Sequence, residues 1–181
     1  GRLAGTKGTV WQYTAIDVAS AYTWATLQVT RRNPSAQWTS ALARTVAADL
    51  AARGWKLERV MSDNAQEFRS ATFQATITKL GARHRFIRAG RPQTNGCVER
   101  VQQTILEECW KPAFARYLIP KQTGLRLDLE RYLEGVPEEH LSADIYSDQL
   151  LAAKLEASGY GLRLALHAVA LVPRNGRNVR A

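Results

Sequence analysis

The 181-residue sequence contains few cysteines, with Cys97 and Cys109 as its only two. Neither has a histidine at zinc-ligand spacing beside it, so two buried thiols are favoured over a disulfide or a metal site. The longest apolar run, residues 164–172, includes His167 and is too short to cross a bilayer. No signal peptide is visible either. These absences predict a cytoplasmic protein.

Acidic residues are missing from one long part of the chain. None occurs between Phe68 and Val98, whereas six basic residues do: Arg69, Lys79, Arg83, Arg85, Arg88 and Arg91. The whole chain has 25 Lys and Arg against 16 Asp and Glu, a net charge of +9. A surplus of this size favours a polyanionic partner, most commonly nucleic acid. Charge alone also allows a merely soluble basic protein.

The order of the expected elements predicts an α/β fold. Residues 10–19 and 22–30 are rich in β-branched and aromatic residues and predict a β-hairpin. Asn33 and Pro34 are expected as the N-cap and first residue of a helix that ends at Gly54. Strands and helices then alternate at 56–61, 70–80, 82–87 and 95–110, before Pro112 interrupts the last helix. This alternation implies a mixed sheet covered by helices.

Two carboxylates bracket the basic segment. Asp63 directly follows an expected strand and Glu99 lies in the first turn of an expected helix, positions from which open α/β sheets present functional side chains. A favourable interaction with the helix dipole explains Glu99 alone, but it does not explain Asp63. Carboxylates bind hard divalent cations, and arginine and lysine neutralise phosphates. The pattern therefore suggests a metal site beside a phosphate backbone, with a plain solvated basic face as the alternative.

Three segments resemble the DDE integrase core of bacterial insertion-sequence transposases and retroviral-type integrases. Residues 62–68 (SDNAQEF) resemble its T/S-D-N-G-x-E-F signature, with Ala65 in place of glycine. Residues 91–100 (RPQTNGCVER) resemble P-Q-T-N-G-x-V-E-R, and residues 16–20 (IDVAS) match I-D-x-x-S. The 35 residues between Asp63 and Glu99 match the family's D-35-E spacing. The resemblance covers roughly residues 8 to 133.

The resemblance implies a ribonuclease-H-like mixed sheet flanked by helices. It also implies metal-dependent DNA cleavage and strand transfer, the chemistry of DNA integration, transposition and recombination, with two Mg²⁺ or Mn²⁺ ions. Asp63 and Glu99 are then both catalytic residues and metal ligands. The implied partners are transposon ends and target DNA, in a homo-oligomer. The residues expected to bind DNA are Arg88, Arg91, Gln93, Thr94, Asn95, Gly96 and Arg100.

The first acid of the family's triad is expected to be absent. In the family it lies on the strand before I-D-x-x-S, which here would precede Gly1, so the core is interpreted as truncated at its N-terminus. Asp17 is then a structural residue, and weak metal binding and feeble or no activity are expected. Residues 1–133 would form the partial core. Residues 134–181 would form a divergent basic tail whose structure the sequence does not reveal.

Two other functions stay open. A non-catalytic DNA-binding remnant would keep the basic face without the chemistry, and a ribonuclease-H-like nuclease would share the fold. The second signature favours integrases over such a nuclease. At positions where many relatives carry basic residues, this chain has Gln102, Gln103 and Leu106. These departures put the DNA contacts of the last expected helix in doubt.

Overall fold

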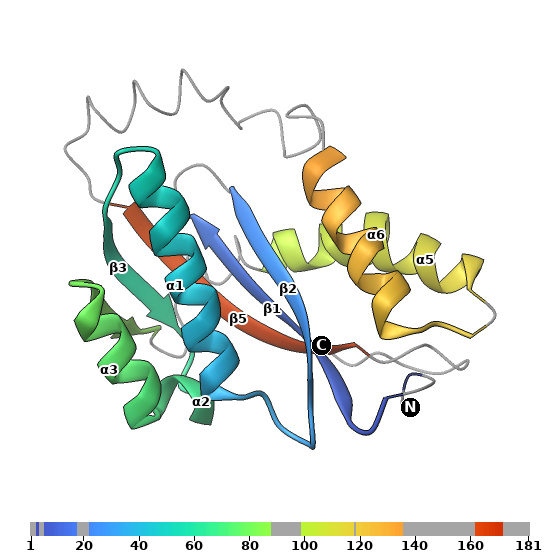
Figure 1. Ribbon diagram of the computed structural model, residues 1–181, viewed down its shortest axis with the longest axis horizontal. Coiled ribbons are helices and arrows are strands. Elements are labelled where there is room, and N and C mark those ends of the chain that lie inside the picture. Colours follow the sequence, from blue (N-terminus) through green and yellow to red (C-terminus); the bar gives the residue numbers. More distant parts are fainter. Residues whose placement is uncertain are drawn as a thin grey trace.

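A computed structural model describes residues 3, 6–17, 22–87, 99–117, 119–135 and 162–171; in the last range, Leu166 has the only described side chain. The described strands are β1 (Thr9–Asp17), β2 (Thr23–Thr30), β3 (Leu57–Ser62), β4 (Arg83–Phe86) and β5 (Leu162–Leu171). They form one sheet in the order β2-β1-β5-β3-β4 (Figure 1). β1 is antiparallel to β2 and β5, whereas β3 is parallel to β4 and β5. The predicted mixed sheet and the antiparallel pairing of its first two strands are confirmed.

The strand in the middle of the sheet, β5, comes from the C-terminal part of the chain. It separates β1 from β3, so it joins the antiparallel half of the sheet to the parallel half. Its sequence, LRLALHAVAL, is a nearly continuous apolar run, which is typical of a strand covered on both faces. The sequence analysis assigned no structure to this segment. The division of the chain at residue 133 stays a prediction.

One face of the sheet is covered by α1 (Ala36–Ala52), α2 (Gln66–Arg69) and α3 (Ala71–Lys79) (Figure 1). Their apolar residues pack with the strands in a first core, which includes Tyr13, Ala15, Leu42, Val46, Leu50, Val60, Phe68, Phe73, Ile77 and Leu166. The predicted glycine stop of α1 is confirmed, because Gly54 has φ of +79°. The predicted N-cap is wrong. Ser35 caps α1, because its extended backbone lets its hydroxyl accept from the Gln37 N–H.

The opposite face is covered by a long helical segment and by α6 (Gln122–Gly135) (Figure 1). The segment is helical over residues 99–104, continues as the π-helical turn η1 (Ile105–Trp110) and passes into α5 (Lys111–Arg116). The expectation that Pro112 interrupts the helix is wrong. Pro112 lies in the first turn of α5, where a missing N–H is tolerated, and the π turn before it shifts the hydrogen-bond register. The second core includes Val10, Ile16, Leu27, Val101, Ile105, Cys109, Trp110, Leu125 and Leu129.

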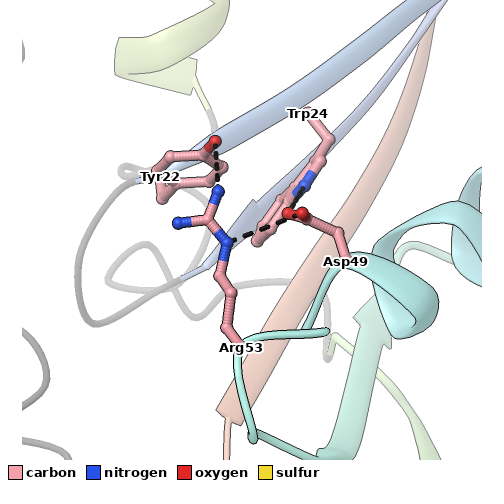
Figure 2. A network of polar contacts seen from close by, with 4 residues as sticks. All are labelled: Tyr22, Trp24, Asp49 and Arg53. Carbon is pink, nitrogen blue, oxygen red and sulfur yellow. Dashed lines mark hydrogen bonds and ion pairs between the residues drawn. The ribbon is translucent and has the colours of Figure 1, made fainter. Parts of the chain in front are cut away.

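A polar network fastens the end of α1 to the start of β2 (Figure 2). Trp24 Nε1 donates to Asp49 Oδ2 at 2.9 Å, and Asp49 Oδ1 lies 3.5 Å from Arg53 Nε. Arg53 Nη2 also donates to the Tyr22 hydroxyl at 3.5 Å. The Tyr22 carbonyl accepts from the Asp17 N–H at 2.9 Å, which links this network to the end of β1. Because one helix end and two strand ends meet here, α1 has a fixed position over the sheet.

The structure bears on two sequence features, the cysteines and the absence of a long apolar run. Cys109 is a buried free thiol, as predicted, and burial raises its pKa to about 12. Cys97 lies outside the described residues. Within the ranges that the structure describes, no helix is long and apolar enough to cross a membrane. Cytoplasmic location stays a prediction.

Candidate active site

Asp63 lies where β3 gives way to α2. The strand ends at Ser62, and the half-buried Asp63 turns back so that its Oδ1 accepts from the Ala65 N–H at 2.9 Å. This is an Asx turn, in which a carboxylate replaces a backbone acceptor. Ala65 has φ of −62°, a value that any residue adopts, so the departure from glycine costs no backbone strain. The turn fixes the direction of the Asp63 carboxylate at the carboxyl end of the strand.

The neighbouring strand position beside Asp63 belongs to His167. Ser62 of β3 pairs with Leu166 of β5 in parallel register, so the next residues along the two strands are Asp63 and His167. His167 in turn pairs with Thr14 of β1. The register therefore defines a row across three strands, Asp63, His167 and Thr14. In this row Asp63 supplies the one carboxylate.

The helical segment that begins at Glu99 is anchored to β1 at the end of this row. Gln12 Nε2 donates to Thr14 Oγ1 at 2.8 Å and to Gln102 Oε1 at 3.0 Å. Its Oε1 accepts from Trp110 Nε1 at 2.6 Å. Gln12 and Thr14 are fully buried. Glu99 is exposed one helical turn before Gln102, so the anchor holds the turn that begins with Glu99 against β1.

Gln102 therefore has a structural role that the sequence did not reveal. The sequence analysis noted it as a departure from basic residues in relatives. In the structure its side chain docks the Glu99 segment on the sheet through Gln12, a residue 90 positions away. The signal that could have found it is the pair of buried-strand polar residues, Gln12 and Thr14, which need hydrogen-bond partners when covered by a helix.

Asp17 is buried at the end of β1 and lies far from Asp63. It pairs with Leu164 of β5, which pairs with Val60 of β3. Asp17 is thus level with a residue three positions before Asp63, about 10 Å along the strand direction at roughly 3.3 Å per residue. It is also two strands away, a further distance of about 10 Å at roughly 4.8 Å per strand. The register supports the structural reading of Asp17.

Most of the expected DNA-binding residues cannot be placed. Arg88, Arg91, Gln93, Thr94, Asn95 and Gly96 lie outside the described residues. Arg100 is exposed on the helical segment next to Glu99. Four members of the basic segment are also exposed: Arg69, Lys79, Arg83 and Arg85. Arg83 and Arg85 belong to β4, the edge strand next to β3, so their positive charge lies on the Asp63 side of the sheet.

The chemistry of the donors fits one divalent cation better than two. Asp63 and Glu99 offer hard carboxylate oxygens of the kind that Mg²⁺ and Mn²⁺ prefer, and Mg²⁺ is commonly held by one or two carboxylates. Two such ions would carry more positive charge than two carboxylates balance. Over the ranges that the structure describes, no three His, Cys, Asp or Glu side chains form a group that could hold a metal.

The fold is that of a ribonuclease-H-like core, a mixed sheet with helices on both faces. The integrase core domain family matches residues 1–92, which is more than half of the chain. The chain therefore belongs to the integrase core domain family.

Solved structures agree on the fold. The catalytic core domain of BIV integrase is similar over 82% of this chain and 89% of that one, with a TM-score of 0.55 and 16% identity. A chain of the simian T-cell lymphotropic virus intasome, solved in complex with a PP2A regulatory subunit, is similar over 72% of this chain and 46% of its own. Its TM-score is 0.54 and its identity 20%. The predicted ribonuclease-H-like fold is confirmed.

A curated relative is the retrovirus-related Pol polyprotein from transposon TNT 1-94 of Nicotiana tabacum. It is 42% identical over 55 residues, which are 30% of this chain. The chain spans only about 4% of that polyprotein.

Proposed function

We propose that this chain is the catalytic core of a transposase or integrase that acts on DNA in integration or transposition, and that the chain alone is feeble in cleavage. The observation that supports this most directly is the arrangement of its two carboxylates. Asp63 is fixed at the end of β3, and the Glu99 segment is anchored through Gln102 to Gln12, which also donates to Thr14 of the cross-strand row. Family membership supplies the reaction class.

Asp63 and Glu99 would be the ligands for one Mg²⁺ or Mn²⁺, while the two-ion site of intact relatives would need a further acid. When bound, such an ion supplies Lewis-acid polarisation of a phosphoryl oxygen. The chain's own contribution is to aim the Asp63 carboxylate through the Ala65 N–H and to hold the Glu99 segment through Gln102. The two strand positions that continue the row from Asp63 are occupied by His167 and Thr14, neither of which is an acidic residue.

The DNA would lie along the basic side of the sheet. Arg83 and Arg85 on β4, together with Arg100, are exposed and positively charged, and phosphate contacts of this kind carry sequence-independent affinity. The six residues predicted to contact DNA between Arg88 and Gly96 remain part of this proposal. Transposon ends and target DNA as substrates, and a homo-oligomer as the working form, are part of this proposal.

The test is Mg²⁺- and Mn²⁺-dependent nicking of supercoiled plasmid by the purified chain. We expect weak nicking that Asp63→Asn and Glu99→Gln abolish and that Asp17→Asn leaves unchanged. Asp17→Asn is the matched control. It also replaces a carboxylate by an amide of the same shape, but in the buried Asp17 at the end of β1, which the register places away from Asp63. Robust nicking that depends on Asp17 and not on Asp63 would overturn the assignment of the carboxylates.

A non-catalytic DNA-binding remnant is the second candidate, and the exposed Arg83 and Arg85 of β4 favour it, because they could bind phosphates without any metal ion. A remnant of this kind would bind DNA with an affinity that falls steeply as the salt concentration rises. The substitution Glu99→Gln would leave this affinity unchanged. Fluorescence anisotropy with a labelled duplex at several salt concentrations measures this. Cation-independent binding without any nicking would support the remnant and contradict the catalytic proposal.

A further inference from the structure

A chain of hydrogen bonds crosses from α3 through β4 to β3 and ends at the peptide of Asp63. Gln74 Nε2 donates to the Phe68 carbonyl at 2.7 Å and lies 2.7 Å from His84 Nδ1. His84 Nε2 lies 2.9 Å from Ser62 Oγ. The Ser62 hydroxyl then donates to the Asp63 carbonyl at 2.9 Å. We call Gln74, His84 and Ser62 the relay.

The partners of the relay fix the direction of every hydrogen bond in it. The Phe68 carbonyl only accepts, so the Gln74 atom facing it must be the amide nitrogen. The second hydrogen of that nitrogen points to His84 Nδ1, which must accept. The imidazole is then neutral with its proton on Nε2, and this N–H donates to the Ser62 oxygen. Ser62 has its own hydrogen committed to the Asp63 carbonyl, so donors and acceptors match throughout.

The surroundings of His84 favour this neutral tautomer. The ring makes edge contacts with Phe73 and Phe86, with centroids 5.3 and 4.5 Å away. Burial lowers the pKa of His84 below its usual value. Protonation would also place a hydrogen on Nδ1 facing the Gln74 amide hydrogens, which would break the first step of the relay.

We propose that His84 and Gln74 are positioning residues for Asp63, acting through the Ser62 hydroxyl on the Asp63 peptide. The peptide that the relay holds is the one that begins the Asx turn, in which Asp63 Oδ1 accepts from the Ala65 N–H. A fixed carbonyl therefore restricts the rotation that would release the carboxylate from this turn. The value of this for catalysis rests on the proposed function, whereas the effect on the turn does not.

Close packing at the positions of Ser62 and His84 does not require polar side chains. Ser62 is fully buried and His84 lies between two phenylalanines, so apolar side chains would fill both places. Replacing hydrogen-bonded partners by apolar groups of similar shape is often nearly neutral for stability. A positioning role and a purely stabilising role therefore predict different results when Gln74 and His84 are both made apolar.

The test uses the whole chain with the double substitution Gln74→Leu and His84→Leu, alongside His84→Gln. Glutamine keeps a donor where His84 Nε2 lies, so it should preserve the contact with Ser62. Thr78→Ala is the matched control, because it removes an exposed α3 hydroxyl that donates to the Gln74 backbone carbonyl and takes no part in the relay. The measurements are the global unfolding free energy, hydrogen exchange of the Ala65 amide by NMR, and the ¹⁵N shifts of the His84 ring.

We expect at least about tenfold faster Ala65 exchange in the double variant, beyond what any loss of global stability from the unpaired Phe68 carbonyl accounts for. Exchange should stay near the parent rate in His84→Gln and Thr78→Ala, and the parent ring should show the Nε2–H tautomer. Unchanged Ala65 exchange in a folded double variant, or an Nδ1–H tautomer in the parent, would overturn the proposal. If the double variant does not fold, the parent tautomer and Ala65 exchange in Ser62→Ala decide it.

These readouts need neither a metal ion nor DNA. Absence of nicking with fast Ala65 exchange in the double variant would contradict the proposed function and leave the positioning role intact. Nicking by the parent chain, together with unchanged Ala65 exchange in the double variant, would support the proposed function and contradict the positioning role.

Discussion

At the residue scale, Asp63 is held at two atoms. The Ala65 N–H fixes its carboxylate, and the Ser62 hydroxyl fixes its carbonyl. The motif SDNAQEF identified Asp63 from the sequence, because serine and aspartate at a strand end form such local turns. His84 and Gln102 were not identified as supporting residues. Their contacts join residues 22 and 90 positions apart, and no local pattern in a sequence records such pairs.

The pH dependence of stability follows from His84. Its folded-state pKa is lowered below 6.5, so the unfolded chain binds more protons as the pH falls through this value. The stabilisation is therefore present above pH 6.5 and is lost on acidification toward the folded pKa. We expect the unfolding free energy to fall in this window, and the fall to be smaller in His84→Gln. Urea unfolding at a series of pH values measures it, and equal slopes in both proteins would contradict this.

Trp110 should matter through its indole N–H as well as its volume. It donates to the fully buried Gln12 Oε1, so Trp110→Phe leaves a buried acceptor without that donor. We expect a loss of about 1–3 kcal/mol beyond the packing change. Trp55→Phe, at a half-buried position in the other core, is the control and should cost clearly less. Denaturant unfolding compares the two, and equal losses would count against the role of the hydrogen bond.

At the scale of elements, the sequence predicted most strands and helices but not their assembly around β5. The hairpin strands and α3 have clear periodic patterns with glycine, proline or serine at their ends. Residues 162–171 form a nearly continuous apolar run, which periodicity cannot assign to helix or strand. Their partners, β1 and β3, lie far away in the sequence. The π turn before Pro112 was also missed, because one proline was interpreted without the register shift that accommodates it.

The central position of β5 predicts a large effect of small changes within it. Leu166 is buried in the first core, so Leu166→Ala should cost about 2–5 kcal/mol through lost burial and a cavity. Ile119→Ala is the control: Ile119 is 61% exposed and its truncation should change stability by less than about 0.5 kcal/mol. Thermal and denaturant unfolding give both values. A loss below about 1 kcal/mol for Leu166→Ala would mean that β5 is not an integral strand.

At the scale of the whole molecule, two cores on opposite faces carry the two carboxylates. The first core supports β3 and hence Asp63, whereas the second supports the segment that begins at Glu99. The net charge of +9 and the exposed arginines of β4 make this side of the sheet suited to a polyanion. At the centre of the row, the strand position of β5 next to Asp63 is a histidine, His167, and not an acidic residue.

The most direct test of this account is to supply the missing carboxylate. His167→Asp places an acid at the strand position next to Asp63, and His167→Asn is the matched neutral control. Circular dichroism first checks that each variant is folded, and Mn²⁺-dependent nicking of supercoiled plasmid is then measured. We predict that His167→Asp nicks faster than the parent, that His167→Asn does not, and that adding Asp63→Asn removes the gain. A folded His167→Asp variant without any gain, or a gain that survives Asp63→Asn, would contradict the account.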